Sequence, residues 1–380
     1  MLFPRPAAAK SPGLAFETMH REGRTYVVAT DDGGRAELTL DPRLQEASEE
    51  VLRTFQIPYG AAVVISVPDG RVLALAGRSA VDPALGPREL ALQAWAPAAS
   101  VFKVVSAAAL VSEGGVSAST RTCYHGGVSS ILPDNLVDLP VIDRRCDTLA
   151  YGLGKSQNAI LAKLATRHLT SEKLARVGRA FGFGEVIPFE LPVEPSHLDV
   201  PVDSLEFART AAGFWHSTLS PLHGALLAAA IANHGEMPAP TLIDRAFGPD
   251  GRELAAAVPA TPPRRVVSMT AAREVGQMME LTTRIGTAKG TFRDKHGRRY
   301  LPVEVAGKTG TLSAQTDKGY VGYSWFIGYA PAEHPTIAFA VALGNQPTWR
   351  IKATYLGRRI VTEYLAERGD RAATHMLAAR

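Results

Sequence analysis

Lys103 is far from every other charged residue in the sequence. Between Glu89 and Glu113 it is the only ionisable side chain, and the apolar residues around it recur at helical spacing. Ser100 lies three residues earlier, so its hydroxyl and the Lys103 amine share one face of the expected helix. Burial and the positive end of the helix would lower the pKa of Lys103, and a neutral amine there could take the proton of a serine nucleophile. An isolated lysine of this kind more often reaches water along its own stem, so the pair needs support from elsewhere.

Two further segments place polar side chains beside apolar runs. Ser156-Gln157-Asn158 precedes an apolar helical run, which puts Ser156 and Asn158 at a helix entrance. Lys308-Thr309-Gly310-Thr311 lies within the strand-like run 303–312. Taken alone, the first segment is compatible with a plain N-cap serine and the second with an edge strand protected by a lysine.

Composition and spacing argue against several other kinds of protein. The second glycine that a phosphate-binding loop requires is missing before both Gly-Lys segments. The ten histidines form no metal-binding motif and none pairs with a cysteine at ligand spacing, so we expect no metal. The net charge is only +4 over 380 residues, and no run of five like charges occurs. We therefore expect no nucleic acid as a partner.

The elements that must position these residues change character along the chain. A helix is expected over Pro42 to Phe55 and a β-hairpin over Ala61 to Ala76. Residues 100–284 have mostly helical patterns. Strand patterns return at 303–312, 323–330 and 336–343, and a last helix is expected over 349–368. Strands from both ends of the chain would then complete one sheet, with a helical insert between them and a site at the junction.

The sequence contains neither a membrane-spanning stretch nor a visible export signal. Its longest apolar runs are far below the ~18 to 20 residues that cross a bilayer. Its two cysteines, Cys123 and Cys146, leave one possible bridge within a loop-rich segment. We expect a disulfide there if the compartment is oxidising, and two free thiols if it is the cytoplasm.

The polar segments also occur in a telling order. Three motifs occur once each and in a fixed order: Ser100-Val101-Phe102-Lys103, then Ser156-Gln157-Asn158, then Lys308-Thr309-Gly310. This ordered set is typical of penicillin-binding proteins and class A β-lactamases. The chain resembles the transpeptidase domain of high-molecular-mass penicillin-binding proteins over about residues 38–365. Other segments that carry the resemblance include Phe181-Gly182-Phe183-Gly184, Ser220-Pro221-Leu222, Gly286-Thr287-Ala288 and Trp325-Phe326-Ile327-Gly328-Tyr329-Ala330-Pro331.

The resemblance implies an α/β fold of the α+β type, with a central antiparallel sheet flanked by helices and an all-helical subdomain. Residues 38–370 would form the transpeptidase domain, with 38–99 and 300–370 in its sheet subdomain and 100–299 in its helical subdomain. Residues 1–37, rich in proline, glycine and charge, are expected to be a loosely structured lead-in or linker.

The resemblance also implies a peptidoglycan D,D-transpeptidase that β-lactams acylate and that requires no cofactor. Ser100 would attack the penultimate D-Ala carbonyl of a stem peptide, Lys103 would remove the serine proton, and Ser156 and Lys308 would pass it to the leaving nitrogen. Asn158 would hold the substrate amide and Lys103. Thr309, Gly310 and Thr311 would form the strand that binds the terminal carboxylate, and the N–H groups of Ser100 and Thr311 would form the oxyanion hole.

The same resemblance implies partners and a location. The partners would be peptidoglycan stem peptides, β-lactam antibiotics and a glycosyltransferase or another wall-synthesis protein. The location would be extracytoplasmic, in the periplasm or cell envelope, although the sequence shows no export segment or anchor. No glycosyltransferase region is visible, which leaves a stand-alone polymerising role in doubt.

Strand geometry sets a condition on this arrangement. Alternation directs Thr309 and Thr311 to one face of their strand and Lys308 to the other. Lys308 can then meet Ser156 only if the strand twists or if the helical subdomain flanks it, and we expect the second.

Some residues depart from the family pattern or favour a relative. The usual Pro-Gly-Ser turn before the nucleophile is Pro97-Ala98-Ala99-Ser100 here. Glu190 and Glu194 lie near the position of the deacylating glutamate of class A β-lactamases, but Leu191-Pro192-Val193-Glu194 resembles penicillin-binding proteins more closely. A D,D-carboxypeptidase, a β-lactamase-type hydrolase and a β-lactam-binding or structural module without turnover remain the alternatives.

Overall fold

The computed structural model describes residues 13–254, 262–316 and 319–378. Its centre is a five-stranded antiparallel sheet with the order β13-β14-β15-β4-β5. The expected hairpin and the expected late strands therefore meet in one sheet, which confirms the predicted fold class. The strands are β4 (Tyr59–Ser66), β5 (Val72–Arg78), β13 (Ala306–Thr316), β14 (Gly319–Ala330) and β15 (Ile337–Asn345).

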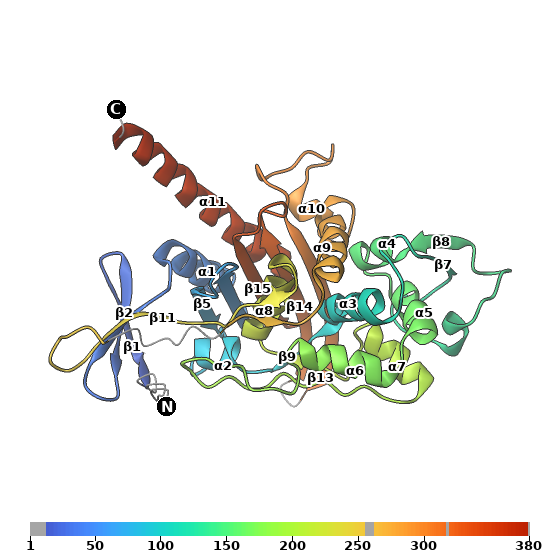
Figure 1. Ribbon diagram of the computed structural model, residues 1–380, viewed down its shortest axis with the longest axis horizontal. Coiled ribbons are helices and arrows are strands. Elements are labelled where there is room, and N and C mark those ends of the chain that lie inside the picture. Colours follow the sequence, from blue (N-terminus) through green and yellow to red (C-terminus); the bar gives the residue numbers. More distant parts are fainter. Residues whose placement is uncertain (1–12, 255–261, 317–318, 379–380) are drawn as a thin grey trace, which may run out of the picture.

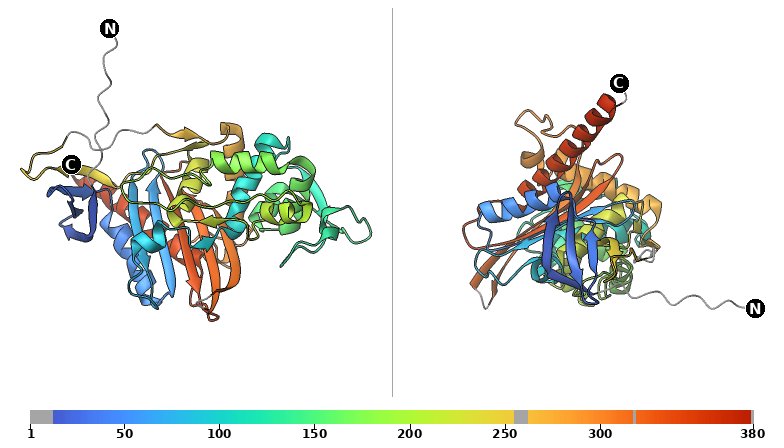
Figure 2. Two further views of the ribbon diagram at one scale, coloured as in Figure 1. Left: turned by 90° about the horizontal axis from the view of Figure 1, so that it is seen from below. Right: turned by 90° about the vertical axis from the view of Figure 1, so that its left-hand side faces the viewer.

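Helices cover both faces of the central sheet (Figures 1 and 2). On one face lies α8 (Pro221–Ala232), all of whose residues are buried, because the helix is apolar on every side. On the other face lie α1 (Pro42–Thr54) and α11 (Ala353–Ala378). The helix α1 begins where the sequence predicts, because the Asp41 side chain accepts hydrogen bonds from the N–H groups of Arg43 and Leu44.

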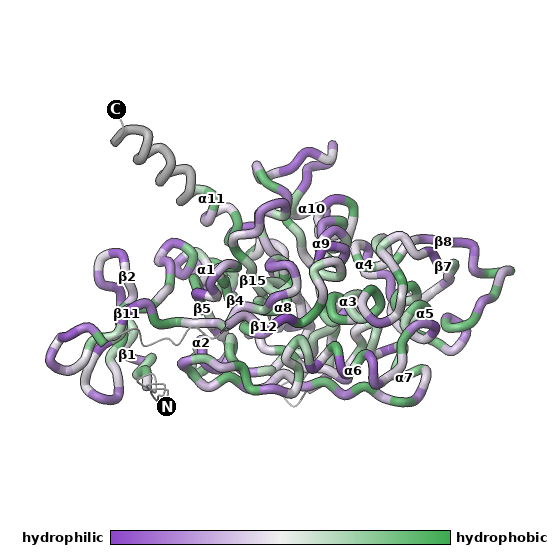
Figure 3. Tube along the Cα trace, in the orientation of Figure 1, coloured by the Kyte–Doolittle hydropathy of each residue, from purple (hydrophilic) through white to green (hydrophobic). Residues whose placement is uncertain are grey.

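A second body of mostly short helices packs beside the sheet and carries the segment between the first two motifs. Figure 3 shows that hydrophobic residues concentrate between these layers, while the loop after α10 (Lys289–Phe292) is hydrophilic. The helices of this body are α3 (Lys103–Glu113), α4 (Leu149–Gly154), α5 (Asn158–His168), α6 (Ser171–Ala180), α7 (Ser204–Ala211), α9 (Met269–Arg284) and α10 (Lys289–Phe292). The short helix α2 (Pro87–Ala91) packs instead on β4 and β5 of the central sheet.

The expectation of an all-helical subdomain over 100–299 is wrong in detail, because short strands interrupt it. They arise where segments run side by side for only a few residues, too briefly to leave a clear alternating pattern in the sequence. These strands are β7 (Arg121–Tyr124), β8 (Arg145–Thr148), β9 (Thr218–Leu219), β10 (Glu236–Met237), β11 (Ile243–Phe247) and β12 (Arg264–Arg265). The strand β9 pairs with β6 (Ala96–Pro97), just before the serine motif.

The expected loose lead-in over 1–37 is also wrong for its described part. Strands β1 (Leu14–Glu22), β2 (Thr25–Thr30) and β3 (Arg35–Leu38) form a small sheet that β11 completes. Glycines at φ +61° and +81° make its turns, and alternate apolar residues such as Val28 and Ala36 are fully buried. The glycines of this segment thus belong to turns, and its charged residues belong to the outer face of the sheet. The pairing of β3 with β11 could not be predicted, because β11 lies about 200 residues further along the chain.

Among the described residues, none of the helices is long and apolar enough to span a bilayer. Nor do the described histidine, cysteine and carboxylate side chains gather anywhere in a group that could hold a metal ion.

Candidate active site

The serine of the first motif lies in a short 3₁₀ helix, Ala99–Phe102, that leads directly into α3. Lys103 is the first residue of α3, and its side chain is completely buried. Its Nζ atom lies 2.6 Å from Ser100 Oγ. The two groups therefore meet one helical turn apart, as their spacing predicts, and the snorkelling alternative for Lys103 is wrong.

Two oxygen acceptors surround the Lys103 amine besides Ser100. Nζ lies 2.7 Å from Asn158 Oδ1 and 2.5 Å from the Ala212 carbonyl oxygen. Burial, and to a smaller degree the charge of Lys308, hold the pKa of Lys103 well below its usual range. A neutral amine has two N–H groups, and these can donate hydrogen bonds to the two oxygens. Its lone pair then faces the Ser100 hydroxyl. This arrangement suits a base that takes the serine proton.

The second motif lies at the junction of α4 and α5. Asn158 is the first residue of α5, and Ser156 adopts the left-handed conformation with φ +56°. Such a conformation is strained for a residue with a β-carbon and is typical of functional sites. The Asn158 amide nitrogen donates to the Val128 carbonyl oxygen at 3.0 Å, which leaves its oxygen directed at Lys103.

The third motif lies on β13, which is at one edge of the central sheet. Lys308 is completely buried, and its Nζ donates to Ser156 Oγ and to the Thr309 carbonyl oxygen, both at 2.9 Å. Burial lowers the pKa of Lys308 to about 7. The helical body therefore flanks the strand as expected, and the alternative of a lysine that protects a free edge is wrong because this lysine is not exposed.

The neighbouring residues of β13 form one wall of a cavity. Thr309, Gly310 and Thr311 line it together with Ser100. A β-carbon at Gly310 would lie 3.0 Å from Trp325 Cβ and 3.2 Å from Val101 Cγ2, so glycine allows the strand to pack tightly against the serine-bearing segment. Thr309 Oγ1 is 2.6 Å from Thr287 Oγ1. Binding of a carboxylate by these threonines stays a prediction.

The cavity has a volume of about 880 Å³ and brings all three motifs together. Of the described residues that line it, none carries a carboxylate. Glu190 instead accepts hydrogen bonds from Thr241 Oγ1 and the Leu242 N–H, and Glu194 accepts from the Ala94 N–H. Other lining residues are Val128, Ser129, Phe214, Trp215, Thr291, Tyr320, Trp349 and Lys352.

A disulfide joins Cys123 and Cys146. The two cysteines face each other across the antiparallel pair β7 and β8, so their separation along the chain is bridged by strand pairing. The disulfide closes the base of the loop 125–144, part of which lines the cavity.

Three parts of the site were not foreseen from the sequence. The carbonyl groups of Val128 and Ala212 carry no signal, because every residue has a carbonyl. Thr287 lies in a segment that carries the family resemblance, and this was the one available signal for it. Phe214 and Trp215 line the cavity from a loop after α7 whose irregular backbone, with φ +42° at Trp215, has no sequence periodicity.

The unusual alanine before the nucleophile has a visible consequence. Ala99 adopts φ +49°, a conformation that glycine reaches at no steric cost but alanine does not. Gly213 packs against it so closely that a β-carbon at position 213 would lie 2.3 Å from the Ala99 carbonyl oxygen. The approach to Ser100 is therefore strained and tightly enclosed.

Comparison with known proteins agrees with this geometry. Residues 60–362 match the family described as penicillin binding protein transpeptidase domain. The chain is 28% identical to "Peptidoglycan D,D-transpeptidase PbpA" of Mycobacterium tuberculosis over 345 residues, covering 82% of this chain and 68% of the relative. It is also 28% identical to the protein of the same name from Mycolicibacterium smegmatis, covering 88% and 73%.

A solved structure shows the same fold. The imipenem acyl-enzyme complex of penicillin-binding protein A from M. tuberculosis superimposes with a TM-score of 0.72 at 26% identity, covering 87% of this chain and 80% of that one. Sequence and structure thus agree over the segment that holds all three motifs. The chain belongs to the family of penicillin-binding protein transpeptidase domains.

Proposed function

We propose that this protein is a serine D,D-transpeptidase that cross-links peptidoglycan stem peptides and is acylated and inhibited by β-lactams. The observation that carries the proposal is the environment of Lys103, whose buried amine meets Ser100 Oγ at 2.6 Å while two oxygens accept its N–H groups. The named activity of the mycobacterial relatives and the β-lactam acyl-enzyme of one of them support the same reaction.

The acylation half of the reaction uses the three motifs in turn. The Ser100 hydroxyl loses its proton to the neutral Lys103 amine, and Oγ attacks the penultimate D-Ala carbonyl to form a tetrahedral oxyanion. The C–N bond then breaks, and the proton that Lys103 removed passes to the leaving nitrogen by way of Ser156, which Lys308 contacts at 2.9 Å. Free D-Ala departs, and the rest of the stem peptide remains as an ester of Ser100.

Substrate binding follows from the position of β13. Because β13 is an edge strand, its outer backbone groups are available to an extended peptide, which adds to the sheet as a further strand. Thr309 and Thr311 lie beside it with hydroxyl groups for the terminal carboxylate, and the buried cation of Lys308 supplies positive potential.

The second half of the reaction decides between cross-linking and hydrolysis. An amine of a second stem peptide attacks the ester carbonyl and forms the amide cross-link as the bond to Ser100 Oγ breaks. One proton of that amine passes to Ser100 by way of Lys103. Efficient hydrolysis would need a base that activates water, and none of the described cavity-lining residues has a carboxylate. This disfavours the β-lactamase alternative, and a D,D-carboxypeptidase would be revealed by product analysis.

The proposal is tested by intact mass. The wild-type protein should gain the mass of one penicillin and lose it only over hours, whereas Ser100→Ala should gain none. With a D-Ala-D-Ala stem peptide and an added amine, the wild type should release D-Ala and form the amide product. Equal adducts on both proteins would refute the role of Ser100. An acylated protein inert toward peptides would instead be a binding module without turnover.

We propose further that the protein works outside the cytoplasm beside a glycosyltransferase. The disulfide between Cys123 and Cys146 supports an oxidising compartment, where such bonds persist. Cross-linking also requires newly made glycan strands, which a glycosyltransferase supplies. Thiol titration of protein isolated from cells should find no free thiol before reduction. A purified glycosyltransferase acting on its lipid-linked precursor should raise the rate of cross-linking by this protein. Free thiols would count against the oxidising compartment, and an unchanged rate would count against the glycosyltransferase partner.

A further inference from the structure

The loop 125–144 accepts a hydrogen bond from the second motif through the Val128 carbonyl group. Val128 lines the cavity, and its carbonyl oxygen accepts the hydrogen bond from Asn158 Nδ2 at 3.0 Å. A carbonyl can only accept, so this contact fixes which end of the amide faces Lys103. If the amide turned over, its NH₂ group would face the Lys103 amine, donor against donor. The loop thus decides whether Asn158 offers Lys103 an acceptor.

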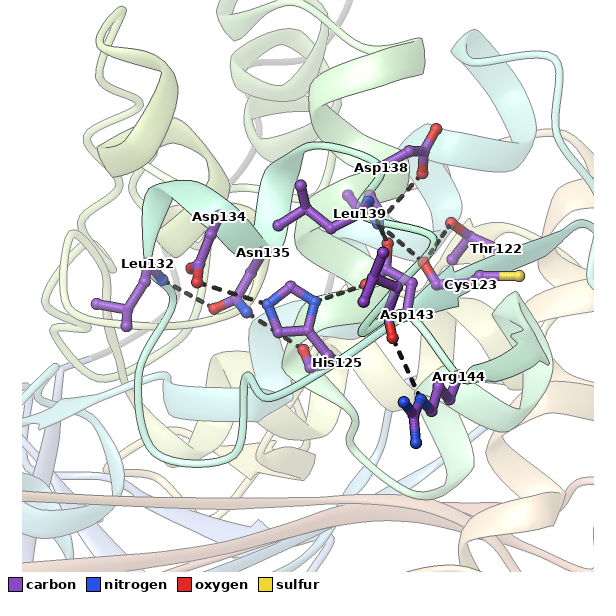
Figure 4. A network of polar contacts seen from close by, with 12 residues as sticks. Thr122, Cys123, His125, Leu132, Asp134, Asn135, Asp138, Leu139, Asp143 and Arg144 are labelled. Carbon is purple, nitrogen blue, oxygen red and sulfur yellow. Dashed lines mark hydrogen bonds and ion pairs between the residues drawn. The ribbon is translucent and has the colours of Figure 1, made fainter.

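Three buried or partly buried groups hold this loop in place. Lys163 is completely buried on α5, the helix that begins at Asn158. Its Nζ donates to Asp143 Oδ2 at 2.7 Å and to the Cys123 carbonyl oxygen at 2.9 Å. The other oxygen of Asp143 lies 2.5 Å from His125 Nδ1 (Figure 4). We call Lys163, Asp143 and His125 the loop anchor.

Further charges surround the loop anchor. Asp138 lies 3.2 Å from Lys163 and also pairs with Arg167 on α5, while Asp134 lies 3.6 Å from the other ring nitrogen of His125. Burial alone would raise the pKa of Asp143, but the hydrogen bonds from Lys163, His125 and the Leu139 N–H outweigh it and hold that pKa well below its usual range. Asp143 therefore lies as a carboxylate between His125 of the loop and Lys163 of α5.

Tight packing couples the loop to the start of α5. Gly127 adopts φ +68°, and a β-carbon there would lie 2.6 Å from Ala159 Cβ and 2.9 Å from the Ala159 nitrogen. Arg209 of α7 donates two hydrogen bonds to the Ile131 carbonyl oxygen, and the disulfide closes the base of the loop. These contacts, together with the loop anchor, join the loop to the start of α5 beside Asn158.

We propose that Lys163, Asp143 and His125 are positioning residues for acyl transfer: they hold the loop so that the Val128 carbonyl keeps the Asn158 oxygen directed at Lys103. The proposal rests on the acyl-transfer function given above. The loop anchor does not touch the substrate. It acts through Asn158, so its effect on the rate should vanish once Asn158 is gone.

A double-mutant cycle tests this dependence. Asp143→Asn keeps the shape of the side chain, and it should lower the second-order rate of acylation by a fluorescent penicillin by about tenfold, within the usual coupling of one polar network. In an Asn158→Ala background the same substitution should change the rate by less than about twofold. Equal losses in both backgrounds would overturn the proposal.

Two variants guard against a purely structural effect. Gly127→Ala displaces the loop without changing any charge, and it should reproduce the loss of acylation. Glu190→Gln is the matched control, because this carboxylate also accepts two hydrogen bonds but lies outside the cavity lining. It should leave acylation within twofold. If Asp143→Asn lowers the melting temperature but not acylation, the loop anchor is structural and the proposal is wrong.

A spectroscopic measurement separates this inference from the proposed function. In protein labelled with ¹⁵N-asparagine, the Asn158 side-chain amide protons should be slow to exchange in the wild type and fast in Asp143→Asn and Gly127→Ala, with Asn158→Ala identifying the signals. This result needs no catalysis. If it holds but the wild type is never acylated, the proposed function fails and the positioning contact stands. An unchanged amide in both variants would refute the positioning role.

Discussion

Buried lysines lie beside the active-site cavity and beside the loop 125–144, and the two groups are stabilised in opposite ways. Of the lysines described, Lys103, Lys163 and Lys308 are completely buried. Lys163 has two carboxylates within 3.2 Å, whereas neither Lys103 nor Lys308 takes part in an ion pair that the described residues supply. Where a carboxylate is provided the lysine is an anchor, and where only neutral oxygens are provided its pKa falls. In the proposed mechanism, counter-charges are therefore absent from the lysines that transfer protons.

The strongest way to break this comparison is to keep the charge of Lys103 but remove its basicity. Lys103→Arg retains a cation that cannot lose its proton near neutral pH, so acylation by penicillin should fall by about 10² to 10⁴. Stopped-flow measurement of the acylation rate checks this. Lys173→Arg, on α6, is the control and should have no effect. A loss below threefold for Lys103→Arg would mean that the amine is only a structural cation.

Stability should respond in opposite directions at the two kinds of lysine. Lys163→Met leaves the buried Asp143 carboxylate without its main partner and should lower the free energy of unfolding by about 3–5 kcal/mol. Lys308→Met removes a buried cation that has no counter-ion. It should raise the free energy of unfolding at pH 7 by at least about 1.4 kcal/mol, the equivalent of one pKa unit. Chemical denaturation gives both values. Losses of equal size would show that the two lysines are stabilised alike.

The pH dependence of acylation sharpens the same contrast. Lys103 must be neutral to act as a base, so the rate should fall as the pH drops below its lowered pKa. Lys308 has a pKa of about 7, so its positive potential is lost above that pH, and acylation by carboxylate-bearing penicillins should fall by up to tenfold per pH unit. An analogue without the carboxylate should lack this second limb. A flat profile for both ligands above pH 7 would rule out the electrostatic role of Lys308.

Folding stability should follow pH with the sign that these shifts dictate. The folded-state pKa of Lys308 is lowered below its unfolded value, so the unfolded chain binds the proton more tightly between about pH 7 and 10.5. Stability contributed by this group therefore increases as the pH rises through that window. Lys308→Met should flatten the rise, which thermal melts across the window would detect.

The smallest expected effect concerns the turn before the nucleophile. Ala99→Gly removes the strain of φ +49° but adds freedom to the unfolded chain, so the free energy of unfolding should rise by no more than about 1 kcal/mol. A calorimetric melt measures it, with the acylation rate followed in parallel. A clear loss of stability would mean that the packing energy of the Ala99 methyl group exceeds the strain energy of the backbone.

Much of the fold could be predicted because its signals are local. Helix α1 begins at a proline after a capping aspartate, and the strands β4, β5, β14 and β15 have apolar, β-branched patterns. The small sheet of β1, β2, β3 and β11 was missed because its last strand comes from a segment far along the chain. Neither of two paired segments carries a sequence pattern that identifies its partner when the two are far apart in the chain.

The sequence by itself determined which side chains can do the chemistry. Ser100 and Lys103 meet because a helical turn brings residues three apart onto one face, and the order of the motifs identifies the family. The tertiary structure alone decided what surrounds them. Packing around one cavity places the Ala212 carbonyl against Lys103 and the Val128 carbonyl against Asn158. The same packing buries Lys308 against Ser156. Backbone carbonyls are the same at every position, so only folding selects the one that accepts from Lys103 and the one that orients Asn158.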